Sequence, residues 1–264
     1  MLSWDIHEGV INEVRYRDEA FTLPWGIETA DTSGFFSLEK GVGYRHKRIK
    51  ENHKELEGDS RFVTQVEMPD GVWLLTIEDS IKSEKVIVRT AYLEALEDTL
   101  LMDFVMRFRF KKKYFESAEI AGNMLVHRAS DVYHQYPVRS AQLNGSKFSV
   151  NIIIENSIDS EVMSPNLYVR DHADEWVVHA RMIPLKIEKV VVKICNSWAK
   201  TRALPDSISR PILGIPGVRN FLWYRNERKP YPRILKRLFN PNAFPMAKLT
   251  KGDTLFWRVK MEIL

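Results

Sequence analysis

The chain is poor in cysteine and has no long hydrophobic segment. Cys195 is the single cysteine among 264 residues, which excludes a disulfide framework and a zinc site built from several cysteines. No stretch approaches the roughly 18 consecutive apolar residues of a transmembrane helix. The first eight residues carry Asp5 and Glu8 and no apolar run, so we expect no secretory signal peptide. These absences predict a cytoplasmic protein in a reducing compartment.

Familiar catalytic signatures are also missing. The sequence has no Walker A loop, no Gly-x-Ser-x-Gly elbow, no His-Glu-x-x-His and no dinucleotide-binding glycine fingerprint. Gly41-Val42-Gly43 lacks the third glycine, and we interpret it as a bulge or the start of a strand. The histidine pairs His127/His134 and His172/His179 are seven residues apart, without the short spacing of a metal motif. We therefore expect neither a bound metal nor an organic cofactor.

What the sequence does contain is alternation of apolar and polar residues. It is 44% hydrophobic and 28% charged, enough apolar material for one large domain or two small ones. Strand-like runs recur with turn residues at close spacing and without intervening helices, which predicts an all-β antiparallel sandwich. The runs cover residues 61–68, 72–78, 86–96, 103–110, 120–127, 148–154, 175–182, 187–194 and 254–264.

Two turns and one ambiguous segment belong to this pattern. Pro69-Asp70-Gly71 separates two of the runs, and Asn144-Gly145 predicts a tight type I′ hairpin, because both residues tolerate a positive φ. Residues 91–100 also fit a short helix, since Leu93, Leu96 and Leu100 are spaced like a helical stripe. Periodicity leaves that choice open.

The character of the chain changes near residue 204. Seven of its twelve prolines lie between residues 205 and 245, a density that disfavours strands. Residues 233–239 predict one short helix after Pro232. Regular alternation returns at 254–264. We interpret residues 1–264 as one sandwich domain, with 204–252 a proline-rich basic insertion before a final strand, 254–264, in the main sheet.

The same part of the chain carries the positive charge. Of 39 lysines and arginines and 35 aspartates and glutamates, residues 196–264 hold 14 and 4, so residues 1–195 hold 25 and 31. The net charges are therefore about +10 and −6. An anionic partner, or docking of the segment on the acidic body of the protein, would explain this asymmetry.

Polar residues suited to sugar chemistry occupy one side of several predicted strands. Arg107 and Arg109 alternate with phenylalanines, and His179 and Arg181 alternate in the same way with apolar residues. His46, His127, His134 and Tyr136 occur in or beside other extended segments. We expect the residues Arg107, Arg109, His127, His134, His179 and Arg181 to line one concave face, at least three of them around a common pocket. A solvated sheet face without a ligand is the alternative.

These residues lead to a first functional hypothesis, carbohydrate binding or processing. Arginine forks bind carboxylate or phosphate, tyrosine stacks on sugar rings, and histidine transfers protons near neutral pH. We assign proton donation or hydrogen bonding to His127, His134 and His179. Contacts to a sugar, or to an anionic derivative such as a sugar phosphate, are assigned to Arg107, Arg109, Arg181, Tyr136 and His46.

In length and strand texture the chain resembles the galactose-mutarotase-type sandwiches, at the level of fold class and without a contiguous motif. The resemblance implies a supersandwich that acts on sugars with one histidine as general acid and a carboxylate as general base. It assigns no role to a particular residue of this sequence.

The second hypothesis is a non-enzymatic module that binds an anionic membrane surface through residues 217–251. Basic residues Arg233, Lys236 and Arg237 flank an apolar helix face, and Trp223 lies nearby, as in interfacial anchors. Nucleic acid is less favoured, because the basic residues surround an apolar helix face and do not extend along a broad strand surface. The alternative is that this helix packs on the body of the protein.

Overall fold

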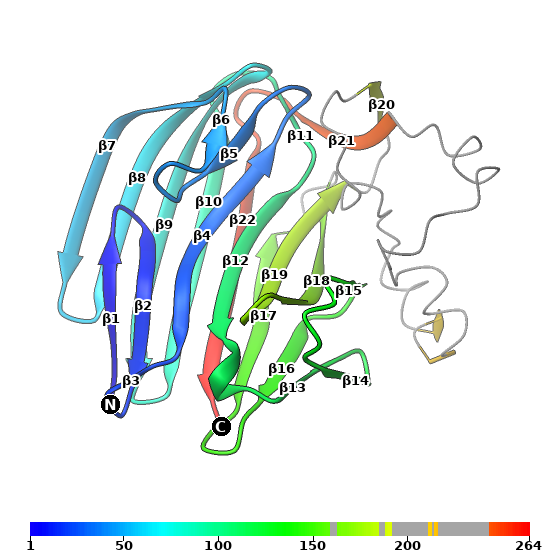
Figure 1. The fold of residues 1–264 in the computed structure, drawn as a ribbon. Helices are drawn as coiled ribbons and strands as arrows, with labels where there is room; N and C mark the ends of the chain where they lie inside the picture. The colour runs from blue at the N-terminus through cyan, green and yellow to red at the C-terminus, as the bar shows by residue number, and fades with distance from the viewer. Residues whose placement is uncertain (159–162, 185–187, 192–210, 213, 216–242) are drawn as a thin grey trace.

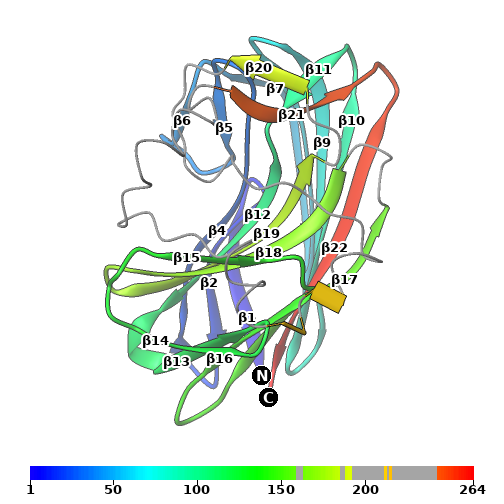
Figure 2. The ribbon, with the colours of Figure 1, turned by 90° about the vertical axis from the view of Figure 1, so that its right-hand side faces the viewer.

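The computed structural model describes residues 1–158, 163–184, 188–191, 211–212, 214–215 and 243–264. Two large antiparallel sheets lie face to face (Figure 1, and from the side in Figure 2). We call the ten-stranded sheet, nearer the viewer in Figure 1, the front sheet, and the nine-stranded one the back sheet. The prediction of an all-β antiparallel sandwich is confirmed.

The front sheet follows the order β1–β2–β4–β12–β19–β18–β15. These strands are β1 (Leu2–His7), β2 (Val10–Tyr16), β4 (Thr22–Ala30), β12 (Phe104–Lys111), β19 (Glu175–Pro184), β18 (Met163–His172) and β15 (Tyr133–Tyr136). Three short strands extend it, with β3 (Glu19–Ala20) on β2, β5 (Phe35–Ser37) on β4 and β6 (Gly43–Tyr44) on β5. The 3₁₀ turn η1 (Lys112–Tyr114) follows β12.

The back sheet follows the order β14–β13–β16–β17–β22–β10–β9–β8–β7. Its strands are β14 (Asn123–Val126), β13 (Ser117–Ile120), β16 (Ser140–Asn144), β17 (Val150–Ile158), β22 (Thr254–Ile263), β10 (Val86–Ala95), β9 (Gly71–Ser83), β8 (Asp59–Met68) and β7 (Lys47–Leu56). A small third sheet joins β11 (Thr99–Leu101), β21 (Ala243–Leu249) and β20 (Glu188–Val191).

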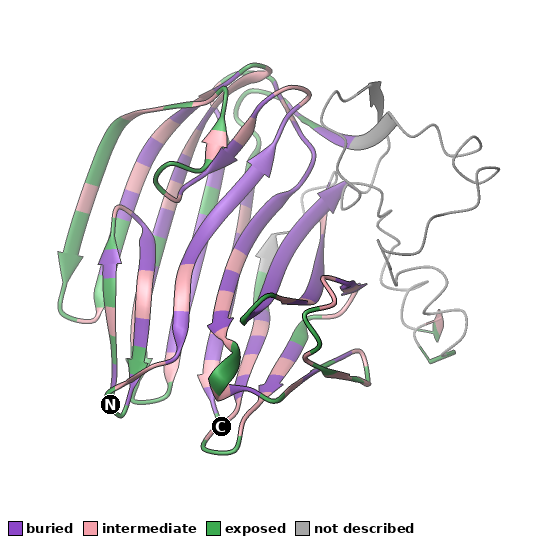
Figure 3. Cartoon of the chain, in the orientation of Figure 1, coloured by how far each residue is buried: buried purple, intermediate pink, exposed green. Residues whose placement is uncertain are grey.

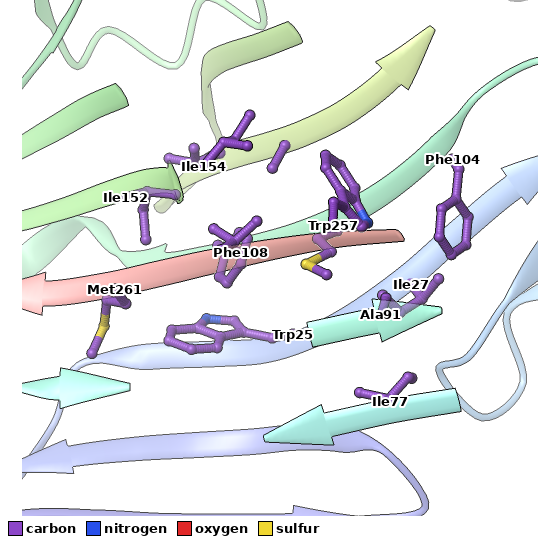
Figure 4. Close-up of a cluster of buried hydrophobic side chains, with 14 of the residues drawn as sticks. Trp25, Ile27, Ile77, Ala91, Phe104, Phe108, Ile152, Ile154, Trp257 and Met261 are labelled. Atoms are coloured by element: carbon purple, nitrogen blue, oxygen red, sulfur yellow. The ribbon is translucent and has the colours of Figure 1, made fainter. Parts of the chain in front are cut away.

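The core fills the space between the two large sheets (Figure 4). Trp25, Phe104 and Phe108 come from the front sheet, and Trp257 and Met261 from the back sheet; all are at most 1% exposed. The final strand supplies five of the core residues at alternate positions: Leu255, Trp257, Val259, Met261 and Ile263. β22 lies between β17 and β10, so the predicted return of this segment to the main sheet is confirmed.

One ion pair is buried in this apolar layer. Arg89 Nε lies 3.2 Å from Asp79 Oδ1, and both side chains are 1% exposed. Arg89 also donates hydrogen bonds to the carbonyl oxygens of Trp25, at 3.3 Å, and Gly9, so it connects the back sheet to the front sheet. Burial raises the pKa of Asp79 to about 6, against the opposing effect of Arg89.

The structure decides two local predictions, the turn after residue 68 and the choice between strand and helix at residues 91–100. β8 and β9 pair around the predicted turn at residues 69 and 70. Residues 91–100 do not form the alternative helix, because they contain the end of β10 and the start of β11.

One turn prediction and one strand prediction need correction. β16 and β17 pair, but Leu143 lies opposite Val150 across a longer loop, and neither Asn144 nor Gly145 has a positive φ. A Cβ on Gly145 would collide with the carbonyl oxygen of Tyr114, so close backbone approach explains this glycine. The run at 120–127 is interrupted, because Ala121 and Gly122 take φ values of +50° and +70° and turn β13 into β14.

Part of the proline-rich segment is visible. Its residues 243–249 form β21, whereas the predicted helix at 233–239 lies outside the described residues. No helix within the described ranges is long and apolar enough to cross a membrane.

Candidate functional site

The structure places four of the predicted residues on the outer face of the front sheet, the face turned away from the core. Arg107 pairs with His179 and Val105 with Arg181 between β12 and β19, and directly paired residues point to the same side of a sheet. Phe104, Phe108 and Phe110 occupy the alternate positions of β12 and face the core. Arg109, two residues after Arg107, therefore shares the outer face.

The side chains in the central part of this face are buried. Every described residue of β19 is buried, on both sides of the strand, which Figure 3 shows as continuous purple in the front layer. His179 is 8% exposed and Arg181 only 1%. An arginine and a histidine buried to this extent need specific partners.

Arg107 has two carboxylate partners that sequence reasoning did not identify. Its Nη1 lies 2.6 Å from Glu28 Oε1 of β4, and its Nη2 contacts Glu39. Burial raises the pKa of Glu28 to about 7, although Arg107 acts to lower it and Glu39 adds to the rise.

Arg181 is held in a similar way. Its Nε donates to Asp103 Oδ2 at 2.9 Å, and its Nη1 donates to Gln135 Oε1 at 2.8 Å. Burial raises the pKa of Asp103 to about 6, opposed by Arg181. Asn166 pairs with Arg181 across β18 and β19. Three fully buried polar atoms here have no hydrogen-bond partner among the described residues: Asp103 Oδ1, Gln135 Nε2 and Asn166 Oδ1.

His179 lies among cations. Its Nε2 is 3.1 Å from the hydroxyl of Tyr168, and the two rings are 4.2 Å apart. Burial lowers the pKa of His179 well below its usual range, and Arg107 and Arg170 lower it further, so the ring is neutral. Arg170 Nη1 donates to the hydroxyl of Tyr133 at 2.7 Å. We refer to these residues together as the outer-face cluster: Glu28, Glu39, Asp103, Arg107, Tyr133, Gln135, Asn166, Tyr168, Arg170, His179 and Arg181.

An open groove of about 960 Å³ lies at one end of the same face. Arg109 Nε donates to Glu175 Oε2 at 2.7 Å across β12 and β19. Glu175 pairs with Lys111 of β12 on one side and His172 of β18 on the other, so the three form a row across the sheet. The groove is lined by Leu23, Arg109, Lys111, Lys112, Lys113, Phe115, Glu116, His127, His172, Ala173, Asp174 and Glu175.

His127 is the one further predicted site residue that lies in this groove. Its Nε2 donates to the carbonyl oxygen of Glu175 at 2.9 Å, and its ring packs edge-on against Trp176, with the centroids 4.9 Å apart. Its Nδ1 accepts a long hydrogen bond, 3.4 Å, from the amide of Ala129. Both ring nitrogens therefore have backbone partners, which favours positioning over proton transfer for this histidine.

The prediction that His134 shares the outer face is wrong. His134 and Tyr136 lie together on the inner side of β15. They pair with Val169 and Leu167, which belong to the core, so both point inward from β15. Burial lowers the pKa of His134 to about 4. Gln135, between them, points to the outer face in their place.

His46 is held at the other end of the front sheet. Its Nδ1 donates to the carbonyl oxygen of Phe35 at 3.1 Å, and its ring packs edge-on against Phe36. Within the described chain, no hydrogen bond or ion pair links it to the groove or to the outer-face cluster.

The candidate membrane-surface residues Trp223, Arg233, Lys236 and Arg237 lie outside the described residues, as does Cys195. The second hypothesis thus stays a prediction. Where the structure is described, no three histidine, cysteine, aspartate or glutamate side chains form a group that could hold a metal ion.

Comparisons with known proteins bear on the fold. No model of a known protein family matches the chain, and no curated protein matches it. Two solved structures are similar over the whole chain. One, assigned as an aldose 1-epimerase of Escherichia coli K12, has 7% sequence identity and a TM-score of 0.50. The superposition covers 100% of this chain and 99% of the epimerase chain. The other, a galactose mutarotase-like protein from Lactobacillus casei, has 8% identity, a TM-score of 0.50 and coverages of 100% and 97%.

At this level of identity the likeness concerns the fold alone. The fold is that of the galactose mutarotase-like sandwiches, as the sequence predicted.

Proposed function

We propose that this protein binds and processes a sugar in the groove at the end of the outer face. The observation that carries the proposal is the row formed by Lys111, Glu175 and His172, with Arg109 hydrogen-bonded to Glu175, in an open groove. Sugar hydroxyls both donate and accept hydrogen bonds, and a row of alternating donors and acceptors at sheet spacing matches them. The descriptions of the two similar structures, an aldose 1-epimerase and a mutarotase-like protein, agree with this choice.

We further propose that the sugar carries an anionic group. Arg107 and Arg181 have their charges matched by Glu28, Glu39 and Asp103, which leaves them little attraction for another anion. Arg109 differs, because Glu175 takes only its Nε and the side chain is 26% exposed. Lys112 and Lys113 line the same groove and have no carboxylate partner within the described residues. A phosphate or carboxylate at this end would have these cations as partners.

Calorimetric titration with D-glucose, D-galactose, D-glucose 6-phosphate and D-glucuronate tests both statements. We expect binding of at least one sugar, tighter for the anionic members. Replacing Arg109 by Ala should weaken binding about 10- to 100-fold, the worth of one charged hydrogen bond, and Arg109→Lys should restore part of it. Arg61→Ala is the matched control, because Arg61 pairs with Glu78 on the back sheet.

Equal affinity for neutral and anionic sugars would remove the anionic requirement. Binding of none of the four, or binding that Arg109→Ala leaves intact, would contradict the groove as the sugar site.

A further inference from the structure

A histidine–aspartate pair lies at the edge of the groove. His172 Nδ1 is 2.9 Å from Asp131 Oδ1, and the two side chains are 45% and 39% exposed. His172 lines the groove, whereas Asp131 is not among the residues that line it. Arg170 Nη1 lies 3.3 Å from the same carboxylate oxygen.

This geometry fixes the position of the proton on the imidazole. An ionised carboxylate only accepts hydrogen bonds, so Nδ1 must be the nitrogen that carries hydrogen. In the neutral ring Nε2 then presents a lone pair, and Nε2 has no partner among the described residues. His127, on the same groove, is the contrast, because its two nitrogens are bonded to backbone groups.

The segment that carries Asp131 is constrained in an uncommon conformation. Ala129 and Asp131 adopt φ values of +50° and +57°, in the left-handed region that costs energy for residues with a Cβ. The Asp171 carboxylate stabilises the segment by accepting hydrogen bonds from the amides of Arg128, at 2.8 Å, and Ser130, at 2.9 Å. The Asp131 amide donates to the carbonyl oxygen of Asp171 at 2.9 Å. These contacts hold Asp131 beside His172.

A cation is available for the negative charge that proton removal creates. Arg109 lines the same groove, and Glu175, its partner, is the direct cross-strand neighbour of His172. The charged and titratable groups around His172 are Asp131 and its partner Arg170, and, lining the groove, Arg109, Lys111, Lys112, Lys113, Glu116, His127, Asp174 and Glu175.

We infer that His172 is a general base that removes the proton of a sugar hydroxyl, with Asp131 as its positioning residue; the inference rests on the proposed function. In the step, the O–H bond of the hydroxyl breaks, its electron pair stays on oxygen, and an N–H bond forms at Nε2. Asp131 stabilises the imidazolium and Arg109 the alkoxide. When the hydroxyl is the anomeric one, the electron pair left on its oxygen forms the C1 carbonyl as the bond from C1 to the ring oxygen breaks, and the ring oxygen takes a proton from water in the open groove. Ring closure on the other face of the carbonyl reverses these steps: the ring oxygen loses its proton to water, and Nε2 returns its proton to the new anomeric hydroxyl.

The first test reads the tautomer directly and needs no substrate. Long-range ¹H–¹⁵N correlation spectra of the labelled protein, with His172 assigned from His172→Asn, should show hydrogen on Nδ1 and a bare Nε2 in the neutral ring. Asp131→Asn should give a mixture of tautomers, because an amide can donate as well as accept. Hydrogen on Nε2 in the unmodified protein would overturn the inference.

The second test measures exchange between the anomers of a bound sugar by NMR magnetisation transfer. His172→Asn should slow exchange by about a hundredfold or more at saturating sugar, where a change in the dissociation constant does not affect the rate. Asp131→Asn should slow it less, because the ring loses the partner that fixes its hydrogen on Nδ1 while Nε2 stays in the groove. His7→Asn is the matched control, since His7 pairs with Glu8 outside the groove, 3.4 Å apart.

The outcomes separate the two proposals. An absence of sugar binding would contradict the proposed function. Binding with an unchanged exchange rate in His172→Asn would overturn the base role alone.

Discussion

Glu28 offers a quantitative test of the buried charges in the outer-face cluster. Its side chain is 10% exposed, and the ion pair with Arg107 Nη1 does not compensate for the loss of water, since its pKa rises from 4.5 to about 7. Glu28→Gln removes the ionisable group and keeps the shape of the side chain. The substitution therefore isolates the cost of the negative charge in the folded protein.

The magnitude follows from the shift. A carboxyl group with a raised pKa in the folded state contributes most stability when it is protonated, and the contribution falls as pH rises from the unfolded pKa to the folded one. One pKa unit corresponds to about 1.4 kcal/mol. The free energy of unfolding of the unmodified protein should thus fall by about 3 kcal/mol, relative to Glu28→Gln, between pH 4.5 and pH 7.5.

Urea unfolding of both proteins at half-unit pH intervals measures this difference. Glu28→Gln also alters the partner of Arg107. Any pH-independent change in the free energy of unfolding that results cancels, because only the variation with pH is compared. Glu78→Gln is the control, since it makes the same chemical change at a half-exposed side chain that is paired with Arg61 on the back sheet. A difference between the unmodified protein and Glu28→Gln that stays constant from pH 4.5 to 7.5 would refute the reasoning.

Two further predictions concern the core. Deleting residues 253–264 removes β22 from between β17 and β10 with five buried side chains, so we expect aggregation in size-exclusion chromatography; a soluble product with cooperative unfolding would contradict this. Asp79→Asn should destabilise the protein by about 3–5 kcal/mol in urea, because Arg89 is left buried without an anion, and the double replacement Asp79→Leu with Arg89→Met should recover part of the loss. A double variant less stable than the single one would show that the pair itself stabilises the fold.

The sequence was informative wherever alternation had a clear apolar side. In β12, Phe104, Phe108 and Phe110 identify the core face, so the outward direction of Arg107 and Arg109 follows. The segment Tyr133–Tyr136 has no such side, since tyrosine, histidine, glutamine and tyrosine follow one another. Alternation could not decide its orientation, and the residues predicted from it faced inward.

The partners of the buried cations could not be predicted, because they are distant in sequence. Arg181 is 78 residues from Asp103 and 46 from Gln135. Glu28 reaches Arg107 only because β4 pairs with β12, and strand order is set by the whole sheet. A signal existed for Glu28, which follows the apolar Trp25 and Ile27 inside a strand-like run, but a charge there is equally typical of a solvated face.

The pair of His172 and Asp131 shows how strand register creates a site that no motif announces. Tyr133 lies opposite Arg170 in the antiparallel pair of β15 and β18, so continuing that register by two residues brings Asp131 opposite His172, 41 positions away. The register is held by the core side of the same strands, where His134 and Tyr136 lie against Val169 and Leu167. A slip of one residue would turn these two side chains outward and Gln135 inward, and would separate the aspartate from the histidine. His134 and Tyr136, which the sequence assigned to the site, thus lie on the core side of the same strand register on which the histidine–aspartate pair depends.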